Sequence, residues 1–179
     1  MLNAVQWLFP KARDRGYQEK LFEAILGPVY TLDQVRDGAE QPTIEAVFRF
    51  VQKRIAADFD ACLERAPFAS GELLFDRPDQ AIEAKFAAGG DGVCLFGFEG
   101  FDSHWTVARG VTTDEVVLFD SWDYQTFDRR QFVWTARAKD INTSARIVVL
   151  PSDLNWISIG RAPKGGVKTA LGRRTSGGP

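Results

Sequence analysis

The spacing of apolar and polar positions changes part-way along this chain. In the first half apolar residues recur every three or four positions, and shorter runs with a period near two follow. The first pattern is typical of amphipathic helices and the second of strands. The helices are predicted over residues 17–26, 42–55 and 78–88. The strands are predicted near residues 93–98, 105–110, 115–120 and 146–150. Helices followed by an antiparallel sheet indicate an α+β fold, with the N-terminal helices packed on the sheet.

Two neighbouring strands carry the most informative pair of residues. His104, the single histidine of the chain, precedes the run 105–110, and Asp120 ends the run 115–119. The turn-prone segment 111–114 between these runs predicts a hairpin. If the turn is centred near its middle, His104 and Asp120 become cross-strand neighbours or nearly so. A carboxylate that orients an imidazole is half of a nucleophilic catalytic apparatus.

The sequence offers no convincing nucleophile for this pair. Strand pairing around the loop before His104 places Cys94 opposite a residue three or four positions beyond His104. Cys94 is therefore expected roughly 10 to 13 Å from His104. Cys62 follows a helical pattern without a preorganising signal, and a structural thiol is the expected role of both cysteines. Ser103 and Ser121 adjoin the pair but point to the opposite strand face.

Metal and phosphate chemistry find little support. Gly89-Gly90-Asp91-Gly92 lacks the lysine of a phosphate loop and precedes a strand. One histidine and two scattered cysteines match no zinc spacing. Asp120, Asp123 and Asp128 have no calcium-loop pattern and are interpreted as solvated turn residues. We therefore expect no cofactor and no metal.

The order of elements resembles a known family. Gln6 is followed by Asp14-Arg15-Gly16 at the head of the first long helix, and the strands of His104 and Asp120 come later. Segments 30–36, 42–54, 124–132 and 147–150 continue the match, which covers roughly residues 5 to 150. This order resembles the papain-like cysteine peptidases that remove double-glycine leader peptides from bacteriocin precursors. That bacterial family has an N-terminal glutamine for the oxyanion hole, Asp-Cys-Gly opening a helix, and a sheet carrying histidine and aspartate.

The resemblance implies a papain-like fold that has lost its nucleophile. Arg15 stands where the family carries its cysteine, and a guanidinium stays protonated and cannot attack a carbonyl. The implied function is a pseudoenzyme that binds a peptide or protein segment in the cleft beside His104 and Asp120, with Gln6 as the remaining oxyanion donor. The residues expected to bind the peptide are Arg15, Trp105 and Trp122. The alternative is an active cysteine-type hydrolase whose nucleophile lies elsewhere, so whether the chain is an enzyme stays open.

Each of these residues also has a purely structural interpretation. A lone histidine on a strand is commonly a hydrogen-bonded structural residue. Only the pairing with Asp120 favours a functional role for His104. Gln6 is more simply interpreted as an ordinary surface amide. Asp14 is most simply a helix N-cap that accepts backbone N–H bonds. Trp105 and Trp122 also suit core and rim packing.

Composition indicates one domain with a different tail. The chain has 179 residues, 45% of them apolar, which suffices for a sizeable core over residues 1–160. Residues 161–179 are rich in Gly, Pro, Ser and Thr and are expected to be disordered. Of the formal charge of −2, this tail contributes +5, so the preceding body carries −7 and would repel nucleic acid.

Location is inferred from what the sequence lacks. No apolar run approaches the roughly 20 residues of a membrane span. The first residues lack a basic region and a cleavage site. Two cysteines at unrelated positions form no disulfide framework. A reduced, cytoplasmic protein without a membrane span is the expectation.

Overall fold

The computed structural model of the protein describes residues 2–26, 41–120, 123–138 and 143–160. Its α-helices are α1 (Leu2–Leu8), α2 (Arg15–Ile25), α4 (Gln41–Phe59), α5 (Pro78–Ala87) and α6 (Thr135–Ala138). Its strands are β1 (Cys62–Pro67), β2 (Gly92–Gly100), β3 (His104–Val111), β4 (Glu115–Leu118), β5 (Thr126–Asp128), β6 (Phe132–Trp134), β7 (Ile147–Val149) and β8 (Leu154–Gly160).

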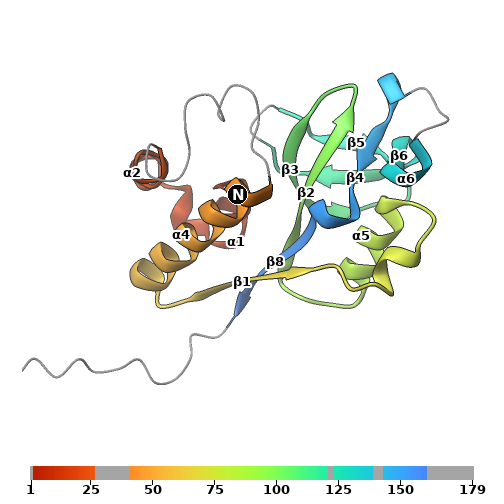
Figure 1. Ribbon diagram of the computed structural model, residues 1–179. Helices are drawn as coiled ribbons and strands as arrows, with labels where there is room; N and C mark the ends of the chain where they lie inside the picture. Colours follow the sequence, from red (N-terminus) through yellow and green to blue (C-terminus); the bar gives the residue numbers. More distant parts are fainter. Residues whose placement is uncertain (1, 27–40, 121–122, 139–142, 161–179) are drawn as a thin grey trace, which may run out of the picture.

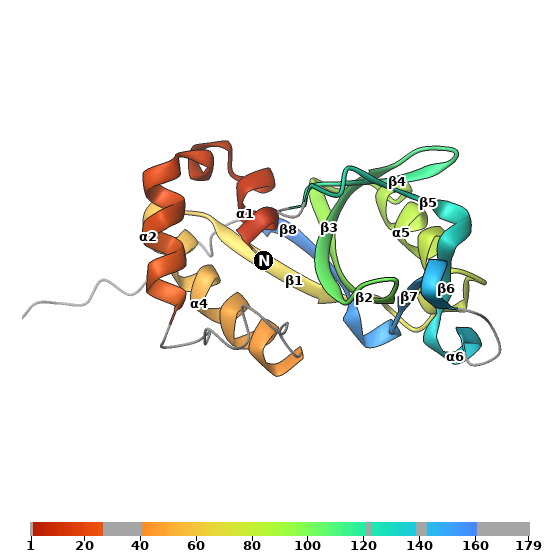
Figure 2. The same cartoon turned by 90° about the horizontal axis from the view of Figure 1, so that it is seen from above.

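One sheet organises the molecule. Its main path runs β1-β8-β2-β3-β4-β5, and neighbouring strands on this path are antiparallel. The C-terminal end of β2 also pairs with β7, and β7 pairs in parallel with β6. Strands β2 to β7 thereby curl around a second core (Figure 2). The predicted α+β class with an antiparallel sheet is confirmed.

Helices α1, α2 and α4 cover one face of the sheet (Figure 1). Val107 of β3 and Leu95 of β2 point to this face, where they join the buried residues of the helices. In both views α2 lies at the outer end of the molecule, with α1 between it and β3 (Figures 1 and 2). We call this side of the sheet the helical face.

The opposite side of the sheet, here called the barrel face, encloses a separate apolar cluster. Ala108, the next residue after Val107, points into it together with Phe96 of β2 and Leu118 of β4. Helix α5 contributes Ile82 to the same cluster. Because neighbouring residues of a strand point to opposite faces, position parity along β3 decides which core a side chain enters.

Local signals in the sequence place the helix ends. The side chain of Asp14 accepts a hydrogen bond from the Tyr17 backbone N–H at 2.9 Å, so the predicted N-cap of α2 is confirmed. Pro78 occupies the first turn of α5, where its missing N–H costs no hydrogen bond. Gly89, just beyond the C-cap of α5, has a φ of +78°. Glycine adopts this left-handed conformation readily, and a glycine in it commonly ends a helix.

The predicted helices correspond to α2, α4 and α5, but β1 and β8 were not predicted. Of the β1 residues only Leu63 is buried, because β1 is an edge strand, so the sequence shows little alternation. Strand β8 lies between β1 and β2, and its first four residues are all buried, so alternation is absent there too. The predicted strand 146–150 is observed as the shorter β7. The expected tail, 161–179, lies outside the described residues.

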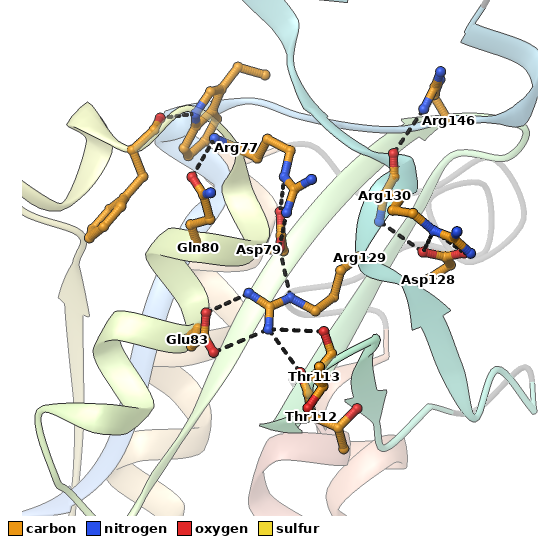
Figure 3. Close-up of polar contacts among 12 residues, drawn as sticks. Arg77, Asp79, Gln80, Glu83, Thr112, Thr113, Asp128, Arg129, Arg130 and Arg146 are labelled. Atoms are coloured by element: carbon orange, nitrogen blue, oxygen red, sulfur yellow. Dashed lines mark hydrogen bonds and ion pairs between the residues drawn. The ribbon is translucent and has the colours of Figure 1, made fainter.

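An ionic network joins α5 to the β3–β4 hairpin on the barrel face (Figure 3). The carboxylate of Asp79, which is buried, accepts two hydrogen bonds from Arg77 and one from Nε of Arg129. The other nitrogens of Arg129 donate to Glu83 and to the backbone carbonyl of Thr112 in the hairpin turn. Arg129 therefore fixes the turn of the hairpin whose open end carries His104 and Asp120.

Among the described residues, no helix combines the length and the apolar character needed to cross a bilayer.

Candidate functional site

The structure brings His104 and Asp120 together. Nε2 of His104 lies 2.9 Å from Oδ2 of Asp120, and the two side chains are 12% and 0% exposed. A carboxylate acceptor selects the ring tautomer with the proton on Nε2, and the other nitrogen, Nδ1, is then the basic one. This is the arrangement in which a carboxylate orients an imidazole.

The pairing of β3 with β4 explains the contact. Ala108 pairs with Leu118, and Phe119 N–H donates to the Val107 carbonyl. Continued outward, this register places Asp120 opposite Thr106, so its contact with His104 is diagonal. Both side chains share the parity of Ala108 and therefore lie on the barrel face.

A buried hydroxyl lies next to the pair. Thr106 has the same strand parity as His104 and is fully buried. Among the described residues its Oγ1 has no hydrogen-bond partner. At the open end of the hairpin, an imidazole, a carboxylate and a hydroxyl thus occupy adjoining positions of the barrel face.

Aromatic rings surround the imidazole. The ring centroids of Phe98 and Tyr124 both lie 6.1 Å from that of His104, in edge-to-face arrangements. Phe101 packs against Phe98 and Tyr124 at 5.6 and 6.0 Å and remains 42% exposed. We call Phe98, Phe101 and Tyr124 the aromatic rim. It turns the surroundings of His104 into a partly exposed apolar surface.

The rim is held in place by the β2–β3 connection. The Tyr124 hydroxyl donates to Oδ2 of Asp102 at 2.9 Å, and this carboxylate raises the pKa of Tyr124. Gly100 has a φ of +126°, and a Cβ there would collide with the Arg146 carbonyl, so only glycine fits before Phe101. The sequence signal for this rim is Phe101, an apolar residue in the short polar loop that precedes His104, and it was not predicted as a site residue.

Neither cysteine reaches His104. Cys94 pairs with Ala108, four residues along β3, which corresponds to about 13 Å at the usual strand rise. Burial raises the pKa of the Cys94 thiol, so it is a poor nucleophile. Cys62 begins β1, three strands away, at a separation on the order of 30 Å. The expected structural role of both thiols agrees with these positions.

Arg15 is not beside His104, contrary to the expectation drawn from the resemblance. Its side chain is 92% exposed and pairs with Glu19 one turn along α2. Helix α2 lies at the outer end of the helical layer (Figures 1 and 2). His104 shares the strand parity of Ala108 and faces the barrel side of the sheet. The physical reason is that α1, not α2, occupies the space next to β3.

Gln6 and Trp105 also lie away from the barrel face. Gln6 belongs to α1, which packs on the helical face, and its backbone carbonyl accepts a hydrogen bond from Arg13 Nε. Trp105 neighbours His104 in sequence but has the opposite parity, and its ring covers Gly97 on the helical face. The expected grouping of both residues with His104 is therefore wrong. Trp122 lies outside the described residues.

A second candidate site lies between α4 and the sheet. A cleft of about 570 Å³ is lined by Glu45, Phe48, Arg49, Arg65, Pro67, Ser152 and Asn155. These residues come from α4, β1, β8 and the 3-10 helix η5 (Pro151–Asp153). Sequence reasoning missed this site because β1 and β8, which form its floor, were not predicted.

Within the described ranges, no three His, Cys, Asp or Glu side chains are grouped closely enough to hold a metal ion. No family model, no curated protein and no solved structure matches this chain. The functional argument therefore rests on the geometry of the two candidate sites.

Proposed function

We propose that this chain is a catalytically degenerate papain-like domain, of the bacteriocin leader-peptidase type, that binds a peptide or protein segment beside His104 and Asp120. The observation that carries the proposal is the 2.9 Å contact between these residues, set in a partly exposed aromatic rim. The His104 and Asp120 side chains are buried, paired and next to exposed apolar surface, which is a suitable setting for binding a peptide.

The distances argue for binding rather than catalysis. Proton transfer to a nucleophile requires a heavy-atom separation near 3 Å, and Cys94 lies about 13 Å from His104. Arg15, at the helix head where the resembled family has its cysteine, belongs to the outer helical layer. A histidine and aspartate without a reacting group still offer a rigid polar anchor for a ligand.

The surface favours a segment with one apolar side chain and one basic group. Phe101 is exposed enough to pack against an apolar side chain, and the neighbouring Asp102 carboxylate attracts a cation. Covering the exposed part of Phe101 removes roughly 80 Å² from water, since a phenylalanine buries about 200 Å². At about 25 cal/mol per Å² this contributes about 2 kcal/mol, or about thirtyfold in affinity.

Selection of random linear heptapeptides against the immobilised protein tests this proposal. Enriched peptides should shift the amide signals of Phe101, His104 and Tyr124 in ¹⁵N spectra. Phe101→Ser should weaken their binding about thirtyfold. Phe22→Ser, on a similarly exposed phenylalanine of α2, is the matched control and should leave binding unchanged. Peptides that bind both variants equally would exclude the aromatic rim as the binding surface.

The hydrogen bond between His104 and Asp120 also supports a second candidate, an active cysteine-type hydrolase with an unrecognised nucleophile. Incubation with fluorophosphonate and iodoacetamide probes distinguishes the two. Stoichiometric labelling of the wild type that His104→Ala abolishes would establish the hydrolase. Labelling that is absent, or unaffected by this substitution, supports the binding domain.

A further inference from the structure

The cleft between α4 and the sheet contains an arginine held in an unusual way. The Arg65 side chain is 14% exposed, and its Nε donates to Oδ1 of Asn155 at 2.8 Å. Asn155 is itself buried, and its Nδ2 donates to the Asp153 carbonyl. A buried amide with both ends bonded fixes the plane of the guanidinium.

The terminal nitrogens of Arg65 have no hydrogen-bond acceptor among the described residues. The nearest carboxylate is Glu45, at 3.7 Å from Nη1, which is an ion pair but too long for a hydrogen bond. Glu45 in turn lies 3.6 Å from Nη2 of Arg49. The fully buried side-chain atoms without a hydrogen-bond partner among the described residues are Thr106 Oγ1 and Thr135 Oγ1, so the terminal nitrogens of Arg65 are open to the cleft, where a ligand can supply their acceptors.

We infer that this cleft binds a carboxylate, which would accept two parallel hydrogen bonds from the terminal nitrogens of Arg65. The fork of a guanidinium matches the two oxygens of a carboxylate in spacing and plane. Arg49, on the α4 side of the cleft, supplies a second positive charge to the same group. The site lies on the helical face and is independent of the proposed function at His104.

The charges favour a monoanion. Arg49 and Arg65 contribute two positive charges and Glu45 one negative charge, so the lining carries a net +1. A phosphate near −2 would meet the Glu45 carboxylate at close range and be repelled. A carboxylate balances the lining without excess charge.

The remaining walls specify what carries the carboxylate. Phe48 and Pro67 present apolar surface beside the two arginines. The volume of about 570 Å³ exceeds that of a small inorganic ion and falls within the range of ligand pockets. The ligand class is therefore a carboxylic acid with an adjoining apolar group, either a small organic acid or the C-terminal residue of a peptide.

A titration followed by ¹⁵N NMR tests the site on the full chain. The Nε–H signal of Arg65 should be observable because its proton is held by Asn155. N-acetyl-phenylalanine, as the small acid, and acetyl-glycyl-phenylalanine, as the peptide C-terminus, should shift this signal saturably, and their amides should not. Tighter binding of the dipeptide would identify a peptide terminus, and equal binding a small acid; either outcome supports the carboxylate site.

Variants separate the site from a purely structural role of Arg65. Arg49→Gln should weaken binding of the acids several-fold, and Arg65→Lys at least tenfold, because lysine cannot form the bidentate fork. Arg54→Gln, on an arginine of α4 that pairs with Asp58, is the matched control and should bind normally. Equal binding of acids and amides, no shift of the wild-type Arg65 signal, or preference for inorganic phosphate would each overturn the inference.

Discussion

Replacement of Arg129 by methionine should destabilise the protein far more than the same change at the neighbouring Arg130. The two side chains differ in exposure, 11% for Arg129 and 85% for Arg130. Arg129 bridges α5 and the hairpin turn, whereas the Arg130 side chain pairs, within the described part of the chain, with the carboxylate of Asp128 two residues away. Arg130→Met is therefore a matched control at an adjacent position.

The magnitude follows from the partners that Arg129 leaves behind. The buried Asp79 would lose one of three hydrogen bonds, at about 1 to 3 kcal/mol for a buried group. Glu83 is about half exposed, so losing its ion pair with Arg129 costs about 1 kcal/mol or less. Together these terms predict a loss of about 3 kcal/mol in the free energy of unfolding. At about 2 to 4 °C per kcal/mol for a chain of this size, Tm falls by about 10 °C.

Urea unfolding followed by circular dichroism, with a thermal scan, measures both quantities. Arg130→Met should leave the free energy of unfolding nearly unchanged, because its pair with Asp128 is exposed to solvent. Coupling is read from a double-mutant cycle of Arg129→Met with Glu83→Gln, which should be non-additive because the two residues are in contact. If Arg129→Met and Arg130→Met destabilise equally, the network does not hold the hairpin and the reasoning fails.

Three further outcomes are expected. Burial and a hydrogen bond to a carboxylate raise the pKa of Tyr17 to about 12, so the stability it contributes is complete below its unfolded value near 10 and is lost as pH rises through 12. Tyr17→Phe should therefore remove one tyrosinate transition near pH 12 from the absorbance at 295 nm and weaken the alkaline fall in stability. Cys94 should resist iodoacetamide until the protein unfolds, and labelling of Cys62 should be the same in His104→Ala; loss of labelling would revive a catalytic thiol. Arg15→Cys should react like an exposed cysteine at a rate that His104→Ala leaves unchanged, and a His104-dependent rate would contradict the separation of α2 from the barrel face.

The correct predictions from sequence have a common physical origin. Periodic burial determined α2 and α4, because each places apolar residues on one side over several turns. In the shorter α5 the pattern depends on Ile82 and Phe86, four positions apart. Hairpin geometry brought His104 to Asp120, because turn length and strand period determine which residues meet. Both are local properties of a continuous segment.

The wrong predictions concern position across the sheet. The family resemblance implied that Arg15, Gln6 and Trp105 gather around His104. Trp105 instead takes the helical face because it is one residue out of phase with His104. Helix α1, and not α2, packs against β3. Such choices depend on how separate elements pack, which local pattern does not encode.

By itself, then, the sequence determined the helices, the hairpin and its His–Asp contact, since these depend on spacing within one segment. The tertiary structure alone decided which face the pair occupies, the aromatic rim around it and the cleft at Arg65. Each of these joins segments far apart in the chain: Arg65 and its partner Asn155 are 90 residues apart, on two strands whose sequences show little alternation. Contacts at that separation arise from packing of the whole sheet, so they become visible only in the folded molecule.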